Sequence, residues 1–166
     1  MRSKIACGLI VGGLLAGAAL AAEQRPVEPG GKIGAMTVAR GDTYHADLDL
    51  FTFYPTLINN PGTYHRSCSP EIVRRLYIGA GDFGWPTQKE ADSHFPEHWS
   101  LWIDSHSVDL PRFGASHSYD YRNGKRVVSK SWNVILVNAP SGKHTIRYRF
   151  KLPQGIVDLT MTVTIP

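Results

Sequence analysis

Cysteine is scarce in this chain of 166 residues, which contains only Cys7 and Cys68. Cys7 lies in an apolar N-terminal segment that we expect to be removed, so a single thiol remains in the mature protein. One thiol excludes an internal disulfide and also a zinc site built from several cysteines. The fold must therefore be held by packing alone. Cys68 is expected to be either buried and inert or free for an intermolecular bond.

The chain also lacks the motifs that usually mark catalysis or nucleotide binding. Gly79–Gly84 matches G-x-G-x-x-G, but Trp85-Pro86 follows where a dinucleotide-binding helix would have to begin. Gly142-Lys143 lacks the earlier glycine and the Ser/Thr of a P-loop, and no H-E-x-x-H zinc motif occurs. We therefore expect no cofactor, and we predict that the glycine-rich segment is a tight loop beside Trp85.

Long hydrophobic runs are also missing, except for one at the N-terminus. Arg2 and Lys4 precede an uncharged apolar segment, and Ala19-Leu20-Ala21 fits the small-x-small rule of signal peptidase. This pattern predicts a signal peptide at residues 1–21 and a periplasmic or secreted mature protein. An uncleaved membrane anchor is the alternative, but the run barely reaches the ~18–20 residues that a span needs. No stable membrane span is expected after cleavage.

The expected mature chain has little net charge. The signal peptide removes two of the 18 basic residues and none of the 14 acidic ones, which leaves 16 against 14, or +2. This balance does not require nucleic acid as a partner, and none is expected. The 145 residues that remain of 166 are enough for one domain with a real core. Residues 22–34 are rich in Pro and Gly and predict a flexible N-terminal arm.

Apolar and polar residues alternate over two long segments near the C-terminus. The first is 144–150 and the second is 157–165, and turn residues lie between them at 152–155. A period of two over this length predicts half-buried β-strands. The segment 132–137 is apolar at every position except Asn133, which predicts a central strand covered on both faces.

Asn123-Gly124 is the strongest turn signal of the sequence and predicts a two-residue β-hairpin. In that hairpin Tyr121 lies opposite Arg126, and Tyr119 lies opposite Val128. Further elements are expected upstream, namely strands at 35–40, 44–54 and 76–78, and a single helical turn that begins at Ser69-Pro70-Glu71.

These patterns sum to about eight short strands and at most one short helix. They predict an all-β fold, an antiparallel β-sandwich of immunoglobulin-like type, with a jelly roll as the alternative. The hairpin at 140–150 and the closing threonine-rich strand resemble the end of many exported immunoglobulin-like modules. We predict that residues 35–166 form a single domain.

The segment His94–Leu110 is crowded with histidine, tryptophan and aspartate. We predict a β-hairpin there with Ser105-His106 at its tip; because neither residue is a glycine, a longer loop is the alternative. In this register Ile103 faces Val108, and Leu101 faces Leu110, so the four apolar side chains share one face. The agreement between the two strands supports the register, because a shift by one residue would scramble the two faces.

Large aromatic side chains are more numerous than one small core usually hides. Trp102 is expected on the polar face of the predicted hairpin, opposite Asp109, and Trp85 borders the glycine-rich segment. Tyr119 and Tyr121 are two residues apart on the strand that precedes the predicted two-residue turn. Exposed aromatic side chains are platforms for flat, partly apolar ligands and for protein partners. The candidate binding residues are therefore Trp85, Trp102, Asp109, Tyr119 and Tyr121.

Four of the seven histidines are candidates for a metal or acid–base site. His94 and His98 are four residues apart, as on one helix face, but Pro96 between them would break such a helix. His106 and His117 could join them only if the fold brings all four together. Surface histidines that bind nothing are the alternative interpretation of the same residues.

The export signal, the all-β pattern and the missing catalytic motifs favour one function. We expect a non-enzymatic exported module that binds a carbohydrate or a protein partner through exposed aromatic side chains. One alternative is a hydrolase or lyase that depends on the histidines and a metal. Another is a purely structural immunoglobulin-like module of an envelope or surface assembly.

Overall fold

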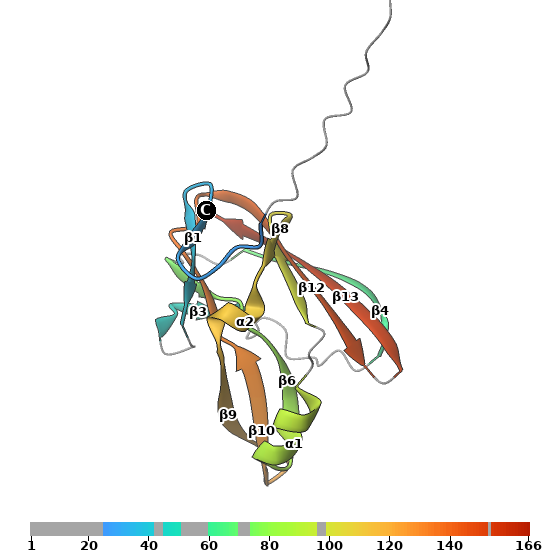
Figure 1. The fold of residues 1–166 in the computed structure, drawn as a ribbon. Helices are drawn as coiled ribbons and strands as arrows, with labels where there is room; N and C mark the ends of the chain where they lie inside the picture. Colours follow the sequence, from blue (N-terminus) through green and yellow to red (C-terminus); the bar gives the residue numbers. More distant parts are fainter. Residues whose placement is uncertain (1–24, 42–44, 51–59, 70–73, 96–98, 153) are drawn as a thin grey trace, which may run out of the picture.

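The computed structural model of the chain describes residues 25–41, 45–50, 60–69, 74–95, 99–152 and 154–166 (Figure 1). These residues are mostly β-strand, which confirms the all-β prediction. The strands are β1 (Gly31–Ile33), β2 (Met36–Arg40), β3 (Leu48–Asp49), β4 (Gly62–Cys68), β5 (Arg75–Tyr77), β6 (Ala80–Trp85), β7 (Ser100–Ile103), β8 (His106–Val108), β9 (Ala115–Arg122), β10 (Lys125–Trp132), β11 (Val134–Val137), β12 (Gly142–Leu152) and β13 (Gly155–Ile165), and the helices are α1 (Gln88–His94) and α2 (Leu110–Phe113).

The first sheet has five strands in the order β4-β13-β12-β7-β8. Its centre is the antiparallel pair of β12 and β13, which extends from Gly142 opposite Ile165 to Leu152 opposite Gly155. In both strands every second residue is buried, as the alternation of apolar and polar residues predicts. The two long C-terminal strands and their hairpin connection are therefore confirmed.

The second sheet has five strands in the order β1-β2-β11-β5-β3. Strand β11 lies between β2 and β5, and its first three residues, from Val134 on, are buried. The predicted central strand at 132–137 is confirmed, but it is divided at Asn133. The Asn133 N–H donates to the Gly114 carbonyl, and the Asn133 carbonyl accepts from the Gly41 N–H. At this residue the chain passes from the third sheet to the second.

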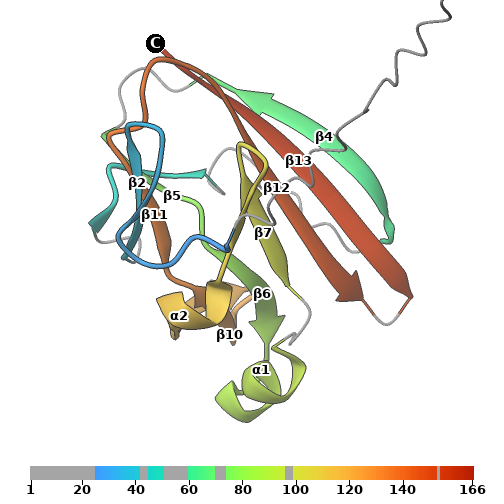
Figure 2. The same cartoon turned by 45° about the horizontal axis from the view of Figure 1, so that its top comes forward.

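The third sheet has three strands in the order β6-β10-β9. Tyr121 lies opposite Arg126 and Tyr119 opposite Val128, as predicted. The turn residues Asn123-Gly124 have φ angles of 51° and 74°, which a two-residue hairpin turn requires. Figures 1 and 2 show this sheet and α1 projecting from one end of the two five-stranded sheets.

One hydrophobic cluster draws its residues from both five-stranded sheets. Ile146 and Tyr148 come from the first sheet, whereas Val38 and Leu136 come from the second, and all four are almost fully buried. The Tyr148 hydroxyl donates to the Ile78 carbonyl at 2.8 Å. Because Ile78 lies between β5 and β6, this bond ties the first sheet to the point where the second and third sheets meet.

The prediction of a purely antiparallel fold with at most one short helix is wrong in two respects. Strand β4 pairs with β13 in parallel, and β3 pairs with β5 in parallel. Long connections separate the strands of each pair, so no tight turn forces them to be antiparallel. In addition, two helices form, α1 and α2.

The glycine-rich segment is a strand and not the predicted tight loop. It forms most of β6, which pairs with β10. A Cβ atom on Gly81 would lie 2.3 Å from the Lys130 carbonyl oxygen, and one on Gly79 would lie 2.2 Å from the Tyr77 hydroxyl. The glycines therefore serve a close approach of backbones, which is their other common role within a sheet.

Helix α1 was not expected, because its sequence has no apolar stripe. Thr87 is its N-cap, and the Thr87 hydroxyl accepts from the Glu90 N–H at 3.2 Å. The same hydroxyl donates to the Glu90 carboxylate at 2.7 Å. Thr-x-x-Glu is the sequence pattern of a capping box, so this signal could have located the helix start.

Part of the predicted N-terminal arm is built into the sheets. Strand β1 pairs with β2, and Val27 forms a parallel bridge with Val108 of β8. The predicted signal peptide at 1–21 and most of the helical turn at 69–71 lie outside the described residues, as do residue 44 and residues 51–54 of the predicted strand at 44–54, of which Leu48–Asp49 form β3. Within the described part of the chain, no helix is both long and apolar enough to cross a membrane.

Candidate functional site

The β7–β8 hairpin forms, but its register differs from the predicted one. Leu101 lies opposite Val108, and Ile103 lies opposite His106. The turn residues are therefore Asp104-Ser105, whose φ angles are 46° and 67°, and not Ser105-His106. Asp tolerates the left-handed conformation better than most residues, which favours a turn that includes Asp104. The pairing is shifted by two residues, so Leu101, Ile103 and Val108 still share the buried face, whereas His106 lies opposite Ile103 and Leu110 begins α2.

Trp102 lies on the solvent-facing side of β7, as the sequence predicts. Its neighbours Leu101 and Ile103 are buried, while Trp102 itself is partly exposed. Its partner across the hairpin is Ser107 and not Asp109, because of the shifted register. A large indole is thus left at the surface on the side of the sheet that faces away from the core.

A groove with a volume of about 370 Å³ lies beside Trp102. Trp102 and Asp109 both line it, so these two predicted binding residues do come together although they are not strand partners. Pro26, Trp99 and Pro111 add apolar surface to the lining. Such a lining, largely apolar with a few polar groups, is typical of ligand sites.

The N-terminal segment and α2 hold one side of this groove. The Val27 N–H donates to the Ser107 carbonyl at 2.7 Å, and the Asp109 N–H donates to the Val27 carbonyl at 2.9 Å. The Asp109 carboxylate lies 3.8 Å from the Arg112 guanidinium. Backbone hydrogen bonds therefore fix the groove edge, and an ion pair at its rim orients Asp109.

Each of the two tryptophans that line the groove contacts a side chain of β12. Trp99 stacks on Phe150 with ring centroids 4.1 Å apart. The Arg147 guanidinium carbon lies 5.2 Å from the centroid of the Trp102 ring. Arg147 in turn makes two hydrogen bonds to the Asp158 carboxylate, one of them at 2.7 Å from Nε. The bond from Arg147 lowers the pKa of Asp158 below its usual range.

The turn of the β7–β8 hairpin is clamped to β12 by a buried histidine that the sequence analysis did not single out. His144 Nδ1 lies 2.8 Å from the Asp104 carboxylate, and His144 Nε2 lies 2.8 Å from the Pro140 carbonyl. The Asp104 carboxylate also accepts from the Thr145 N–H at 2.7 Å. Because both partners of the imidazole are acceptors, only the protonated ring satisfies both bonds.

Burial of His144 lowers its pKa, but the bonds to Asp104 and Pro140 outweigh this effect and raise the pKa above 6.5. An alternating strand does not reveal such a residue, since His144 occupies a position that the pattern assigns to an apolar side chain. The only sequence signal is this exception itself, a histidine at a buried position. Polar groups at buried positions are normally hydrogen-bonded, so the exception predicts a partner but not which one.

The other three predicted binding residues lie on the third sheet and not at the groove. Trp85 and Tyr119 both face Val128, one from each side, so the three side chains share a row. The exposed fraction is 50% for Tyr119 and 72% for Tyr121. Arg126 lies over the Tyr119 ring, 4.2 Å from its centroid. The five candidates thus form two separate groups.

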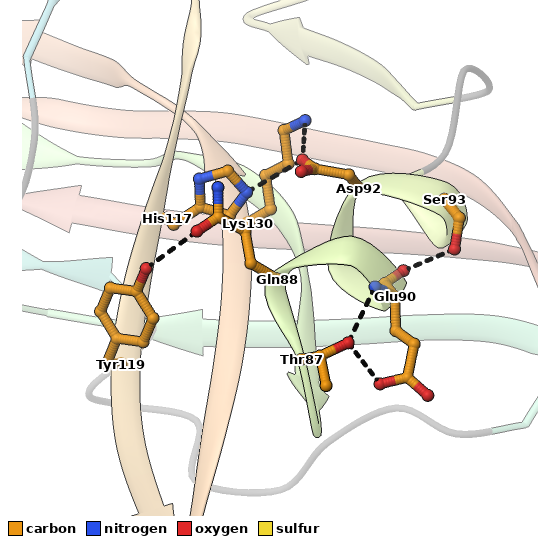
Figure 3. A network of polar contacts seen from close by, with 8 residues as sticks. All are labelled: Thr87, Gln88, Glu90, Asp92, Ser93, His117, Tyr119 and Lys130. Atoms are coloured by element: carbon orange, nitrogen blue, oxygen red, sulfur yellow. Dashed lines mark hydrogen bonds and ion pairs between the residues drawn. The ribbon is translucent and has the colours of Figure 1, made fainter.

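A polar network joins α1 to the third sheet (Figure 3). Asp92 accepts from Lys130 Nζ at 2.6 Å and from His117 Nε2 at 2.9 Å. The Tyr119 hydroxyl donates to the Gln88 side-chain oxygen at 3.2 Å. The hydrogen bond from Lys130, followed by that from His117, lowers the pKa of Asp92 below 3.8. This network holds the helix against the sheet and leaves the His117 imidazole engaged.

Of the four predicted metal ligands, the structure describes the side chains of His106 and His117, which lie in different sheets. His106 is in the first sheet, where its Nδ1 donates to the Asp104 carbonyl at 2.8 Å, whereas His117 is in the third sheet and binds Asp92. The His94 side chain and all of His98 lie outside what the structure describes. Among the side chains that are described, no group of three or more His, Cys, Asp or Glu could hold a metal ion.

Comparison with known proteins gives no family. No protein-family model and no curated protein sequence matches the chain. Two solved structures are similar, namely PbICP-C in complex with falcipain-2 (14% identity, TM-score 0.36, covering 71% of this chain and 97% of that one) and the solution structure of Amebosin (16% identity, TM-score 0.26, covering 72% and 97%). Similarity at this level carries no argument about the type of fold or the function.

Proposed function

We propose that this chain is an exported, non-enzymatic module of immunoglobulin-like β-sandwich type that binds a ligand at the groove beside Trp102. The two five-stranded sheets that share one hydrophobic cluster support the sandwich part of this proposal. The apolar N-terminal segment behind Arg2 and Lys4 supports export. The ligand is a carbohydrate or a protein of the periplasm or the extracellular space.

The partial exposure of Trp102 is the observation that carries the proposal. Its strand neighbours Leu101 and Ile103 are buried in the core, so Trp102 is not needed to fill the core from that side. It lines a groove together with Asp109, whose carboxylate supplies a hydrogen-bond acceptor at the rim. Indole rings beside a polar group are a common platform for sugar rings and for interface side chains.

Replacement of Trp102 tests the proposal. Trp102→Ala should abolish binding to the ligands that the unchanged chain selects on a glycan array or in a pull-down of envelope proteins. Trp85→Ala and Tyr121→Ala are matched controls, since both remove a large aromatic side chain from the third sheet. If Trp102→Ala leaves every binding event unchanged, the groove is not the site.

Export and the remaining alternatives are tested separately. Mass spectrometry of the protein from cells should find an N-terminus immediately after Ala21. A histidine-dependent hydrolase would contain stoichiometric metal when purified without a tag, and a purely structural module would cross-link in cells to one large partner. The rings of His106 and His117 each bond to an oxygen of the protein, and this observation does not favour the hydrolase.

A further inference from the structure

The positive charge of the chain is concentrated on one sheet face. Every second residue of β12 faces away from the core, and four of these five residues are basic: Lys143, Arg147, Arg149 and Lys151. The only acidic side chain on the same face of β13 is Asp158. Four positive charges and one negative charge leave +3 on the outward side of these two strands, whereas the expected mature chain carries +2 in total. The rest of the mature chain is therefore close to neutral.

We call this surface the basic face, defined by Lys143, Arg147, Arg149 and Lys151 on β12 with the outward residues of β7 and β13. It adjoins the groove directly. Trp102 lies opposite Arg147, and Ser100 lies opposite Arg149, and both Ser100 and Trp102 line the groove. A ligand that leaves the groove across the sheet therefore meets Arg147 and Arg149 first.

Only one of the four cations is neutralised by a neighbour. Arg147 makes its two hydrogen bonds to Asp158, and no other residue of the basic face has a carboxylate partner within the described part of the chain. Arg149 and His65 nevertheless act on Asp158 and contribute to its lowered pKa, after the larger effect of Arg147. Several positively charged groups of this sheet thus act together on the Asp158 carboxylate.

Apart from Ile156, which is exposed opposite Lys151, the remaining outward side chains of β12 and β13 are hydroxyl groups. Thr160, Thr162 and Thr164 follow one another along β13 and are partly exposed, and Thr145 lies opposite Thr162. Alternate residues of a strand are about 7 Å apart, so the hydroxyls form a regular row beside the row of cations. The face therefore offers cations, hydroxyls, one indole and one exposed isoleucine.

We propose that the ligand of the Trp102 groove is an acidic polysaccharide, which lies across the basic face with its carboxylates against Arg149 and Lys151. This inference rests on the proposed function. Charge complementarity selects an anionic ligand, and the indole and the hydroxyl row match the faces and hydroxyls of sugar rings. An extended peptide would instead favour the unpaired backbone of an edge strand; β12 is paired on both sides, and the edge strand β8 beside the groove is already bonded to Val27.

Calorimetric titration with polygalacturonate, alginate and hyaluronate tests this ligand class. Each polymer is compared with its methyl ester, which keeps the sugar backbone and removes the negative charge. The acidic forms should bind at least about tenfold more tightly than the esters. Raising NaCl from about 0.05 M to about 0.5 M should weaken the binding, because exposed charges are screened.

A double variant assigns the effect to the basic face. Arg149→Gln with Lys151→Gln should weaken binding of the acidic polymers by about threefold to tenfold. Lys32→Gln with Lys125→Gln removes the same charge from exposed positions on other sheets and should leave binding unchanged. An equal loss in both double variants would mean a general charge effect and would overturn the assignment.

Failure of this inference and failure of the proposed function are distinguishable. If the methyl esters bind as tightly as the acids and Trp102→Ala abolishes both, the groove is the site but its ligand is not acidic. If no polysaccharide binds but a protein is retained by the unchanged chain and not by Trp102→Ala, the groove is the site and its ligand is a protein. The proposal of an acidic polysaccharide is then wrong. If Trp102→Ala changes no binding at all, the proposed site itself is wrong.

Discussion

The two five-stranded sheets and the three-stranded sheet are held by different interactions. In the first pair, alternate residues of long strands meet in one apolar cluster. In the third sheet, β9 contains no buried residue, and β10 contains only Val128 and Ser129. Besides the backbone pairing of β6 with β10 and the contact of Phe95 with Trp132, polar contacts of Asp92 with Lys130 and His117 attach α1 to this sheet. The comparison is between two sheets that share an apolar core and a third sheet in which polar contacts contribute more.

Removal of a core side chain should have the largest effect. Ile146 is fully buried and lies between Ile103 and Met161. Ile146→Ala should lower the free energy of unfolding by about 3 kcal/mol through lost apolar contacts and the cavity left behind. Urea unfolding measures this difference. Thr160→Ala, on the opposite side of the same sheet, should change stability by less than about 0.5 kcal/mol; equal losses would contradict a core located between the sheets.

The buried His144 should make the free energy of unfolding depend on pH. The pKa of His144 is raised above 6.5, so the folded chain holds this proton more tightly than the unfolded chain. The stabilisation is complete below about pH 6.5 and is lost as pH rises through the folded pKa. Denaturant unfolding at several pH values should show this fall for the unchanged chain and a flatter profile for His144→Gln.

Asp104→Asn provides a matched test of the same clamp. The substitution keeps the size of the side chain and removes the charge that faces His144. It should lower the free energy of unfolding by about 2 kcal/mol at about pH 6, where the imidazole is protonated, and by less at high pH. A loss that is equal at all pH values would mean that the Asp104–His144 pair is not the source of the pH dependence.

Loosening of the third sheet should have the smallest effect on global stability. Asp92→Asn removes the charge that Lys130 and His117 share. Amide hydrogen exchange should become faster in α1, while the melting temperature should change by less than about 2 °C. Lys89→Gln, which removes an exposed charge from the same helix, is the control. Faster exchange throughout β12 and β13 would show that the two regions are not independent.

The same comparison explains how much the sequence reveals. The long strands β12 and β13 follow from the alternation at 144–150 and 157–165, and Asn123-Gly124 locates the β9–β10 turn. The faces of the β7–β8 hairpin are predicted correctly although its turn is displaced, because a shift of two residues preserves parity. Local patterns therefore give the strands and their faces.

Long-range contacts are what the sequence does not reveal. The parallel pairing of β4 with β13 joins segments that are almost a hundred residues apart, and no local signal specifies it. The glycines of β6 were assigned to a loop, since a close approach of Gly81 to Lys130 depends on the partner strand. For the same reason the sequence selects Trp102 as exposed but does not separate it from Tyr119 and Tyr121.

Which of the two regions binds the ligand is decided by one measurement. Titration of the unchanged chain, Trp102→Ala and Tyr121→Ala with the ligand found on the glycan array or in the pull-down compares the groove with the third sheet. Trp102→Ala should weaken binding at least about tenfold, while Tyr121→Ala should leave the Kd unchanged. The opposite pattern, a loss with Tyr121→Ala and none with Trp102→Ala, would place the site on the third sheet and contradict a binding groove at Trp102.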